Sequence, residues 1–504
     1  LDNPEALLVC NGYKDEAFIR LALMSQKLGK KVFIVVEKLD ELELIERVSV
    51  ELGVKPNIGL RIKLVSAGEG RWSSSAGEYS KFGLNTMELM EALEIAKNKN
   101  ILDCIKLIHF HLGSQITNIR RIKDSLKEVG RFYSELMQFG CNIQYIDVGG
   151  GLGIDYDGSR STFASSTNYS VQEYANDVVY HLLEICQAEN LPHPNIISES
   201  GRAMTAHHSI LVVNVLDVTS FPEWSDKIEI SEDAPDVVKE ILDVLDSTSN
   251  KNLIESWHNA LHLKDEVQNK FLLGLISLAD RSVAERIYWG ICRKIEKLSS
   301  RLKFLPEDIR SLRTRLADKY FCNFSIFQSV PDSWAIDQVF PVVPLHRLNE
   351  EPTRDATLED ITCDSDGRID NFIGTNRGTE NTLRVHSLKP GENYSLCIFL
   401  TGAYQEILGD LHNLFGDTNT IHVSLKDDGS LNYEQVIEGE DVTDVLDYVQ
   451  FSADELAGRI DGFLIGCVQR GVVTQKEADD FLSLYKEGLN GYTYLVKPDT
   501  DEKN

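Results

Sequence analysis

The chain has 504 residues, of which 42% are hydrophobic and 26% charged, so its composition is globular and its length exceeds that of one ordinary domain. Lys and Arg together number 51 and Asp and Glu 79, which gives a formal net charge of -28. This acidic excess argues against nucleic acid and anionic membranes as partners, and either solubility or attraction of a cationic substrate accounts for it.

Residues 1–217 alternate short apolar runs with amphipathic helical patterns, which is typical of β/α units around a parallel sheet. Helices are predicted over Asp15–Leu28 and Ile122–Phe139, and each is followed by a glycine that can end it. Six strands are predicted in this part: Ala6–Cys10, Val32–Val36, Ile58–Lys63, Ile105–His111, Ile143–Val148 and Asn195–Glu199.

The remainder of the chain changes character twice. Residues 231–319 have a nearly continuous helical pattern and are interpreted as a helical insertion. Residues 320–442, together with a strand at 210–220, are predicted to form a β domain with a hairpin from Val423–Leu425 into Leu431–Val436. Residues 453–490 return to helical periodicity and are expected to form a C-terminal helical segment.

The fifth predicted strand runs into three consecutive glycines, Gly149, Gly150 and Gly151. Residues without side chains let backbone N–H groups approach an anion such as phosphate, although a tight structural turn explains the run equally well. The sixth strand leads into Glu199, Gly201 and Arg202. Glycines and an arginine in two successive loops predict a phosphate cradle, and the spacing is not that of a dinucleotide-binding GxGxxG motif.

The position of these two loops raises a question of strand number. In (β/α)8 barrels the phosphate site typically uses the loops after strands 7 and 8. Here the loops follow the fifth and sixth predicted strands, and six strands cannot close such a barrel. We therefore expect two further strands upstream of Leu1, so that the chain would have a truncated or processed start.

His109 and His111 lie on the same face of the fourth predicted strand, near its end. A histidine there can stack on an aromatic cofactor, and the alternative is a core histidine held by a hydrogen bond. A metal site is not predicted, because no third ligand has suitable spacing.

The segment Ile361–Gly367 ends a strand of the predicted β domain. It carries one thiol, Cys363, and two carboxylates, Asp364 and Asp366. The alternatives are an ordinary turn and a functional loop.

Several segments, in order along the chain, resemble the biosynthetic arginine decarboxylases of the ornithine, diaminopimelate and arginine decarboxylase family. Phe324–Asp337 and the helical insertion favour arginine as the substrate, whereas single motifs could be shared with ornithine or diaminopimelate decarboxylases. The resemblance covers essentially the whole chain, and its main segments are Asn11–Asp15, His109–Gln115, Asp147–Gly153, Glu199–Ala203, Thr362–Gly367, Gly402–Glu406 and Leu411–Asp417.

The resemblance implies a (β/α)8 barrel of alanine-racemase type, with six of its eight strands present, a β domain, the helical insertion and the C-terminal helical segment. It implies a homodimer or homotetramer with sites at the subunit interface. The implied reaction converts L-arginine to agmatine and CO2 in polyamine (putrescine and spermidine) biosynthesis. The implied cofactor is pyridoxal 5'-phosphate, and the family resemblance alone adds Mg2+.

The resemblance also implies roles for individual residues. The catalytic residues would be His111, which stacks on the pyridine ring, Glu199, which pairs with the ring nitrogen, and Cys363, which returns a proton to the carbon that loses CO2. Asp147, Asp364 and Asp366 would bind the substrate, the last two through its guanidinium group. The phosphate would be bound by Ser114, Gly149, Gly150, Gly151, Gly201, Arg202 and Tyr404.

One departure from the family is serious. The family's cofactor lysine lies in a Tyr-x-Ile-Lys-Val-Asn-like strand that has no counterpart here, and Lys14 and Lys63 match other family segments. Two alternatives therefore stay open: a catalytically inactive regulatory relative of the decarboxylases, and a decarboxylase of ornithine, lysine or diaminopimelate.

The nine cysteines are widely scattered and form no CxxC pair, so neither a zinc site nor a disulfide framework is predicted. No apolar stretch approaches the roughly 20 residues that a membrane helix needs. We therefore expect a cytoplasmic location.

Overall fold

A computed structural model describes residues 3, 6–65, 80–221, 228, 230–299, 307–374 and 378–496. The chain divides into two compact units. The first, here called the barrel unit, comprises Leu1–Ser209, Thr375–Gly378 and Leu400–Tyr404, and the second unit comprises the remainder. Parts of the predicted segments 1–217, 231–319 and 320–442 therefore lie outside the described residues.

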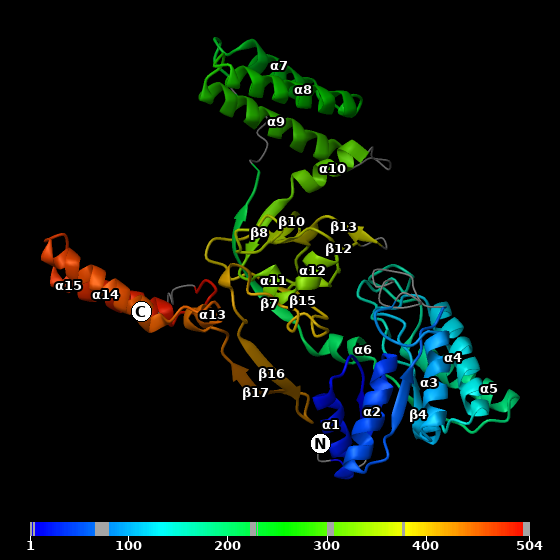
Figure 1. The fold of residues 1–504 in the computed structure, drawn as a ribbon. Helices are drawn as coiled ribbons and strands as arrows, with labels where there is room; N and C mark the ends of the chain where they lie inside the picture. Colours follow the sequence, from blue (N-terminus) through cyan, green and yellow to red (C-terminus); the bar gives the residue numbers. More distant parts are fainter. Residues whose placement is uncertain are drawn as a thin grey trace. The chain divides into compact units, whose positions relative to one another are not determined.

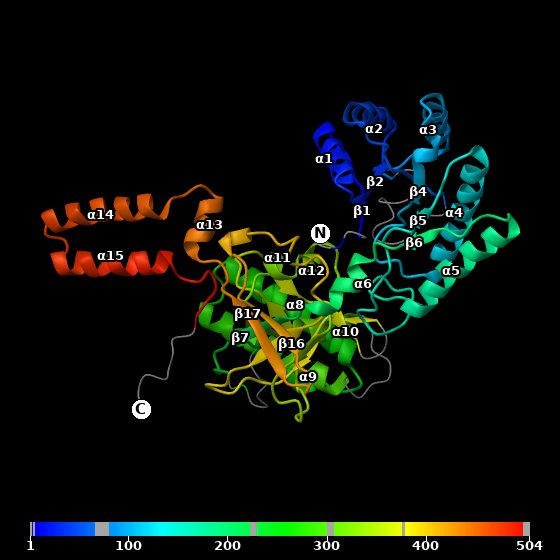
Figure 2. The ribbon, with the colours of Figure 1, turned by 90° about the horizontal axis from the view of Figure 1, so that it is seen from below.

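The barrel unit contains one parallel sheet of six strands in the order β1-β2-β3-β4-β5-β6. In Figure 2 the strands follow a curve with the helices on its outer side, and Figure 1 gives the same elements in chain colours. The strands are β1 (Leu7–Cys10), β2 (Lys31–Val36), β3 (Ile58–Arg61), β4 (Ile105–His109), β5 (Tyr145–Asp147) and β6 (Asn195–Ile197). The helices are α1 (Glu16–Lys27), α2 (Leu39–Leu52), α3 (Thr86–Asn98), α4 (Ile119–Phe139), α5 (Val171–Ala188) and the short α6 (Gly201–Thr205).

The central strands are apolar on both faces, as expected for a parallel sheet covered by helices. Alternate residues of β2 divide between the faces: Ile34 belongs to the main core, which the sheet shares with the helices, whereas Phe33 and Val35 belong to a small cluster with Leu107 and Tyr145. The six predicted strands are confirmed, and β3 to β6 end one or two residues earlier than predicted.

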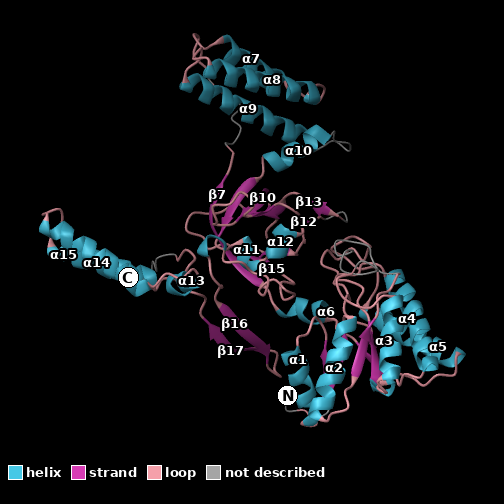
Figure 3. Ribbon diagram, viewed as in Figure 1, coloured by secondary structure: helices cyan, strands magenta, loops and turns pink. Residues whose placement is uncertain are grey.

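The second unit contains a seven-stranded mixed sheet, distinguished by colour from the helices in Figure 3. Its main path is β11-β10-β8-β7-β15-β9, and β14 pairs with β10; only β8 and β10 run parallel. The strands are β7 (Leu211–Thr219), β8 (Asp318–Cys322), β9 (Val342–Pro344), β10 (Arg354–Glu359), β11 (Arg368–Ile369), β14 (Leu383–Val385) and β15 (Ser395–Ile398). β12 (Phe372–Ile373) and β13 (Thr379–Glu380) form a separate short ladder.

The second unit also has two helical segments. Four helices pack around one apolar core: α7 (Asp236–Ser247), α8 (Leu253–Leu272), α9 (Leu278–Ser299) and α10 (Glu307–Arg315). The remaining helices are α11 (Ile326–Ser329), α12 (Pro331–Ala335), α13 (Val442–Tyr448), α14 (Ala453–Gln469) and α15 (Gln475–Leu489). The predicted hairpin is confirmed as β16 (Thr420–Leu425) and β17 (Leu431–Ile437). Of the helices that the structure describes, none has the length and apolar character of a membrane span.

Candidate cofactor and substrate site

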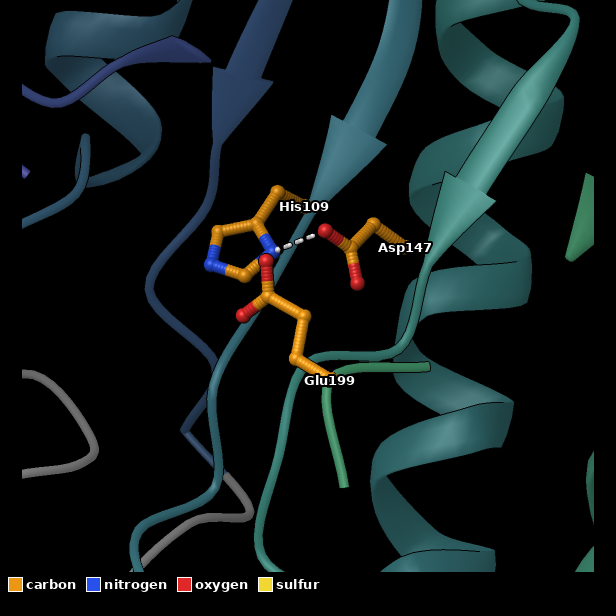
Figure 4. Close-up of side chains that lie close together, drawn as sticks. All are labelled: His109, Asp147 and Glu199. Carbon is orange, nitrogen blue, oxygen red and sulfur yellow. Dashed lines mark ion pairs between the residues drawn. The ribbon is translucent and has the colours of Figure 1, made fainter. Parts of the chain in front are cut away.

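Three titratable side chains converge where neighbouring strands of the barrel unit end (Figure 4). His109 is the last residue of β4, Asp147 is the last residue of β5, and Glu199 follows β6 by two residues. His109 Nδ1 lies 3.1 Å from Asp147 Oδ2, and one oxygen or nitrogen atom of each side chain lies within 4.8 Å of the other two. Adjacent parallel strands end at one edge of the sheet, so residues far apart in the chain meet there.

Burial sets the ionisation of this group. Burial lowers the pKa of His109 to about 4 and raises the pKa of Asp147 to about 6. Glu199 is more exposed, but its carboxyl group faces the other two side chains, and burial followed by the charge of Asp147 raises its pKa. Above pH 6 the site therefore holds a neutral imidazole beside the ionised Asp147, and the negative charge of Asp147 favours a cationic group next to Glu199.

The glycine run forms a turn that other residues could not adopt. Gly149 has a φ of +66°, and a Cβ there would lie 2.1 Å from the Phe110 carbonyl oxygen. Gly151 has a φ of +103°, and its Cβ would lie 2.7 Å from the Gly113 carbonyl oxygen. At both positions the positive φ and the short distance to a backbone oxygen exclude a side chain, so both require glycine.

Two amides of this turn bind side chains of the barrel unit itself. Gly149 N–H donates to Asp147 Oδ1 at 2.9 Å, and Gly150 N–H donates to Nδ1 of His111 at 3.3 Å. This differs from the expectation that both amides meet an anion, because the preceding strand places polar acceptors within their reach. The turn therefore orients Asp147 and His111.

His111 is half-buried beside this turn. Burial, followed by the charges of Arg61 and His109, lowers the pKa of His111 to about 4. A neutral ring that accepts at Nδ1 carries its proton on Nε2. The side chain is thus an uncharged flat ring next to Gly150, as stacking on an aromatic group requires.

Arg202 lies in α6 and is only 6% exposed. Its Nη1 donates to the Tyr156 hydroxyl at 2.9 Å and its Nη2 donates to Ser114 Oγ at 3.2 Å. Its Cζ lies 5.0 Å from the centre of the Tyr404 ring, within range of a cation–π interaction. Nε has no hydrogen-bond partner among the described residues.

These surroundings fit a phosphate group. A buried guanidinium with hydroxyl partners retains its full charge, and burying such a charge is costly unless an anion pairs with it. A phosphate would supply that anion and could accept from Nε of Arg202. Gly201 leaves room for the group, because a Cβ there would lie 3.3 Å from the Tyr404 hydroxyl oxygen.

Four residues around this site were not predicted as members of it. The Asn11 amide donates to Glu199 Oε1, Arg61 Nη1 lies 3.0 Å from Oε2 of Glu37, and Tyr156 supports the buried guanidinium. Asn11 and Glu37 directly follow β1 and β2, and Arg61 ends β3, so the common edge of the predicted strands could have identified these three. Tyr156 has no comparable signal in the sequence.

The sequence argument against a metal site considered ligands spaced along one segment, and the absence of a metal site stays a prediction. His109, Asp147 and Glu199 come from three strands and together have the donor types of a metal site. The same three groups also suit a cationic ring nitrogen, so their chemistry alone does not require a metal.

Asp147 was expected to contact the substrate, and the structure gives a different picture. Its side chain is 0% exposed and is occupied by the Gly149 amide and the neighbouring His109 ring. Substrate contact by Asp147 therefore stays a prediction, and the burial of its carboxylate argues against it.

The second unit carries the three predicted residues of the β domain on one exposed loop. Cys363, Asp364 and Asp366 are all exposed. The Cys363 amide donates to Asn413 Oδ1 at 3.0 Å, and Asp364 Oδ2 lies 3.1 Å from Nε2 of His412. The loop thus presents a thiol and two carboxylates outward from its own unit.

Family models match three of the four regions of the chain. Residues 2–206 match the pyridoxal binding domain of pyridoxal-dependent decarboxylases, residues 231–313 the arginine decarboxylase helical bundle domain, and residues 442–495 the arginine decarboxylase C-terminal helical extension. The biosynthetic arginine decarboxylase of Bacteroides thetaiotaomicron is 52% identical over 492 residues, covering 97% of this chain and 78% of the relative. That of Rhodopirellula baltica is 45% identical, covering 97% and 77%.

Solved structures agree with this result. The crystal structure of the biosynthetic arginine decarboxylase of Campylobacter jejuni has a TM-score of 0.83 and 34% identity, covering 98% of this chain and 79% of its own. A diaminopimelate decarboxylase of Helicobacter pylori shares the fold at a TM-score of 0.54 and 16% identity. The sequence and the structure together show that this chain belongs to the biosynthetic arginine decarboxylases of the pyridoxal-dependent decarboxylase family.

Proposed function

We propose that this chain catalyses the decarboxylation of L-arginine to agmatine and CO2 with pyridoxal 5'-phosphate as cofactor, in polyamine biosynthesis. The observation that carries the proposal is the meeting of Glu199, the Gly149–Gly151 turn and buried Arg202 at the carboxyl ends of neighbouring strands. About 50% identity over nearly the whole chain to biosynthetic arginine decarboxylases supports the choice of substrate.

Each side chain has a physical task in this proposal. Arg202 and Ser114 bind the phosphate, and Gly149, Gly150, Gly151 and Gly201 leave room for it, with Tyr404 packing on the guanidinium. His111 packs its neutral ring against the pyridine. Glu199 accepts from the ring nitrogen and keeps it protonated. When bound, the cofactor supplies an electron sink for the charge left on the carbon that loses CO2.

We assign Asp147 a positioning role in place of substrate contact. Its carboxylate is fixed by the Gly149 amide beside His109, and its charge favours the protonated form of any base next to Glu199. Asp147 thus acts on the ring nitrogen through Glu199.

The exposed loop of the second unit supplies the remaining groups. Asp364 and Asp366 offer carboxylates to the guanidinium of arginine, and Cys363 donates a proton to the carbon after CO2 leaves. We propose that the chain acts as a homodimer or homotetramer with its sites at the subunit interface, because a loop so exposed suits a site shared between copies.

Two further proposals concern the cell and the metal. All nine cysteines are free thiols, which supports a reducing, cytoplasmic location. Mg2+ is proposed from the family resemblance alone. We propose that His109, Asp147 and Glu199 serve the ring nitrogen and are not the ligands of this ion.

CO2 release from arginine, ornithine, lysine and diaminopimelate, measured side by side, tests the substrate. Arginine is expected to be turned over at least ten-fold faster than the others, because a site that pairs carboxylates with a guanidinium leaves them unpaired around a shorter amine. Equal or faster release from ornithine would overturn this choice.

A catalytically inactive regulatory relative is the second candidate. Lys14, the buried lysine next to the Asn11 turn, is paired with Glu41 at 3.3 Å and so is not available to a cofactor. Absence of CO2 release from all four amino acids by the protein isolated from its native source, together with intact binding of pyridoxamine phosphate, would favour this candidate over the enzyme.

A further inference from the structure

At the same edge of the sheet as the candidate site, the barrel unit contains a network of four charged side chains: Lys14, Glu37, Glu41 and Arg61. Lys14 and Glu41 are 2% exposed and Glu37 is 1% exposed. Lys14 Nζ lies 3.3 Å from Glu41 Oε2, and Arg61 Nη1 lies 3.0 Å from Glu37 Oε2. The Glu37 amide donates to Glu41 Oε2 at 2.8 Å, which joins the two ion pairs.

This network holds the turn that follows β1. The Gly12 amide donates to Glu37 Oε1 at 2.7 Å, and the Lys14 amide donates to Glu41 Oε1 at 3.0 Å. The Lys14 ammonium group also donates to the Gly12 carbonyl oxygen. Two buried carboxylates and one ammonium group therefore fix the backbone on both sides of Gly12.

The turn carries a side chain that reaches the catalytic carboxylate. The Asn11 amide nitrogen donates to Glu199 Oε1, whereas Asn11 Oδ1 has no hydrogen-bond partner within the described part of the chain. No hydrogen bond within the described part of the chain therefore holds the Oδ1 end of the Asn11 side chain in place. Its orientation depends on the backbone that Glu37 holds.

We propose that Glu37 is a positioning residue for Glu199, acting through the Gly12 amide and Asn11 on one side and through Arg61 on the other. The inference rests on the proposed function, in which Glu199 accepts from the ring nitrogen. Among the described residues, Glu37 makes its hydrogen bonds and ion pair with Gly12, Glu41 and Arg61 and none with Glu199. It fixes where the Asn11 donor meets Glu199, and it holds the charge of Arg61 near His111 and Asp147.

The type of interaction supports a role in orientation. A buried ion pair adds little stability compared with apolar side chains of the same volume, because both charges must leave water. Carboxylates with several fixed donors do, however, define the direction of each donor closely. Residues that orient metal-ligating side chains typically change affinity or activity by about 10- to 100-fold when replaced, and we expect an effect of this order for Glu37.

The test measures the affinity of the full chain for pyridoxamine phosphate, and the 15N chemical shift of the bound ring nitrogen. Glu37→Gln keeps the size and one acceptor oxygen but loses the charge. We expect it to weaken binding about ten-fold and to move the ring nitrogen toward its unprotonated shift. Glu16→Gln, which changes an exposed carboxylate that pairs with Arg20 and Arg47, is the matched control and is expected to change neither readout.

A double-mutant cycle separates positioning from a general structural role. Asn11→Leu removes the donor to Glu199, so Glu37→Gln added to it should cause a smaller loss than Glu37→Gln causes alone, because only the path through Arg61 remains. If the two losses multiply, or if Glu37→Gln alone binds as the wild type does, the inference is overturned. If the wild type itself does not bind pyridoxamine phosphate, the proposed function would be overturned instead.

The cycle has a safeguard against misfolding. Glu37→Gln leaves Arg61 without its partner, so the pair Glu37→Gln and Arg61→Met, which removes both charges, is the second variant. This double variant is expected to keep the wild-type circular dichroism spectrum and still bind pyridoxamine phosphate about ten-fold more weakly. Wild-type affinity in this folded variant would equally overturn the inference.

Discussion

The mouth of the barrel unit and the exposed loop of the second unit both carry polar, ionisable side chains, but in opposite settings. At the mouth, His109, Asp147 and Arg202 are buried and held by specific partners. On the loop, Cys363 and Asp366 are exposed, and few contacts hold them. A buried, oriented set of groups can hold a cofactor by itself, whereas an exposed set is suited to a ligand that arrives from outside its own unit.

This difference separates two demands on the proposed enzyme. The cofactor must keep a fixed protonation state, which requires low exposure and preorganised partners. The substrate must enter and leave, which requires accessible groups. Changes at the mouth should therefore alter stability and cofactor binding, and changes on the loop should alter turnover alone.

The largest effect is expected from filling the turn at the mouth. Gly149→Ala places a Cβ 2.1 Å from the Phe110 oxygen at a positive φ, so we expect the free energy of unfolding to fall by about 3 kcal/mol or more. Gly458→Ala in α14 meets no atom within 4 Å and should raise it by up to about 1 kcal/mol. Denaturant unfolding of the two variants checks this, and equal stability would refute the requirement for glycine.

The next effect concerns the phosphate. Arg202→Met removes the buried charge, and we expect pyridoxamine phosphate to bind about 30-fold more weakly, since charge-assisted hydrogen bonds of this kind are worth roughly 1.5–3 kcal/mol. Pyridoxamine, which lacks the phosphate, is the control ligand, and its affinity should change by less than two-fold. An equal loss of affinity for both ligands, measured by fluorescence titration, would show that Arg202 does not bind the phosphate.

A smaller effect is expected from pH. The pKa of His111 is about 4 in the folded chain and 6.5 in the unfolded one, so the unfolded state takes up the proton first and stability falls as the pH drops from 6.5 to 4. Over this pH range we expect the free energy of unfolding of His111→Asn to fall by about 2 kcal/mol less than that of the wild type, after a discount for partial exposure of the ring. Asp147, whose raised pKa acts in the opposite direction, is present in both proteins, so the difference isolates His111.

The smallest effect on binding is expected on the loop. Cys363→Ala should leave the affinity for pyridoxamine phosphate within two-fold of the wild type, because the thiol is exposed and belongs to the second unit. In the decarboxylation assay the same variant should slow correct reprotonation of the product carbon. Unchanged turnover and product in deuterium oxide would remove Cys363 from that role.

Hydrophobic patterning was sufficient to predict the strands and hairpin but not the polar contacts of the site. Runs such as Val32–Val36 are apolar on both faces, and this pattern is local in the sequence. The contacts of Asn11 with Glu199 and of Arg202 with Tyr156 join residues far apart in the chain, and no periodicity encodes them. The occupation of the Gly149 and Gly150 amides was missed for the same reason, since it depends on where the preceding strands end.

The central claim is that Glu199 holds a protonated pyridine nitrogen at the mouth of the barrel unit. The 15N chemical shift of labelled pyridoxamine phosphate, bound to the chain at pH 8, tests this directly. We predict the shift of a protonated ring nitrogen in the wild type and that of an unprotonated one in Glu199→Gln, because a neutral amide cannot stabilise the ring cation. An unprotonated nitrogen in the wild type, or the same shift in both proteins, would contradict the account.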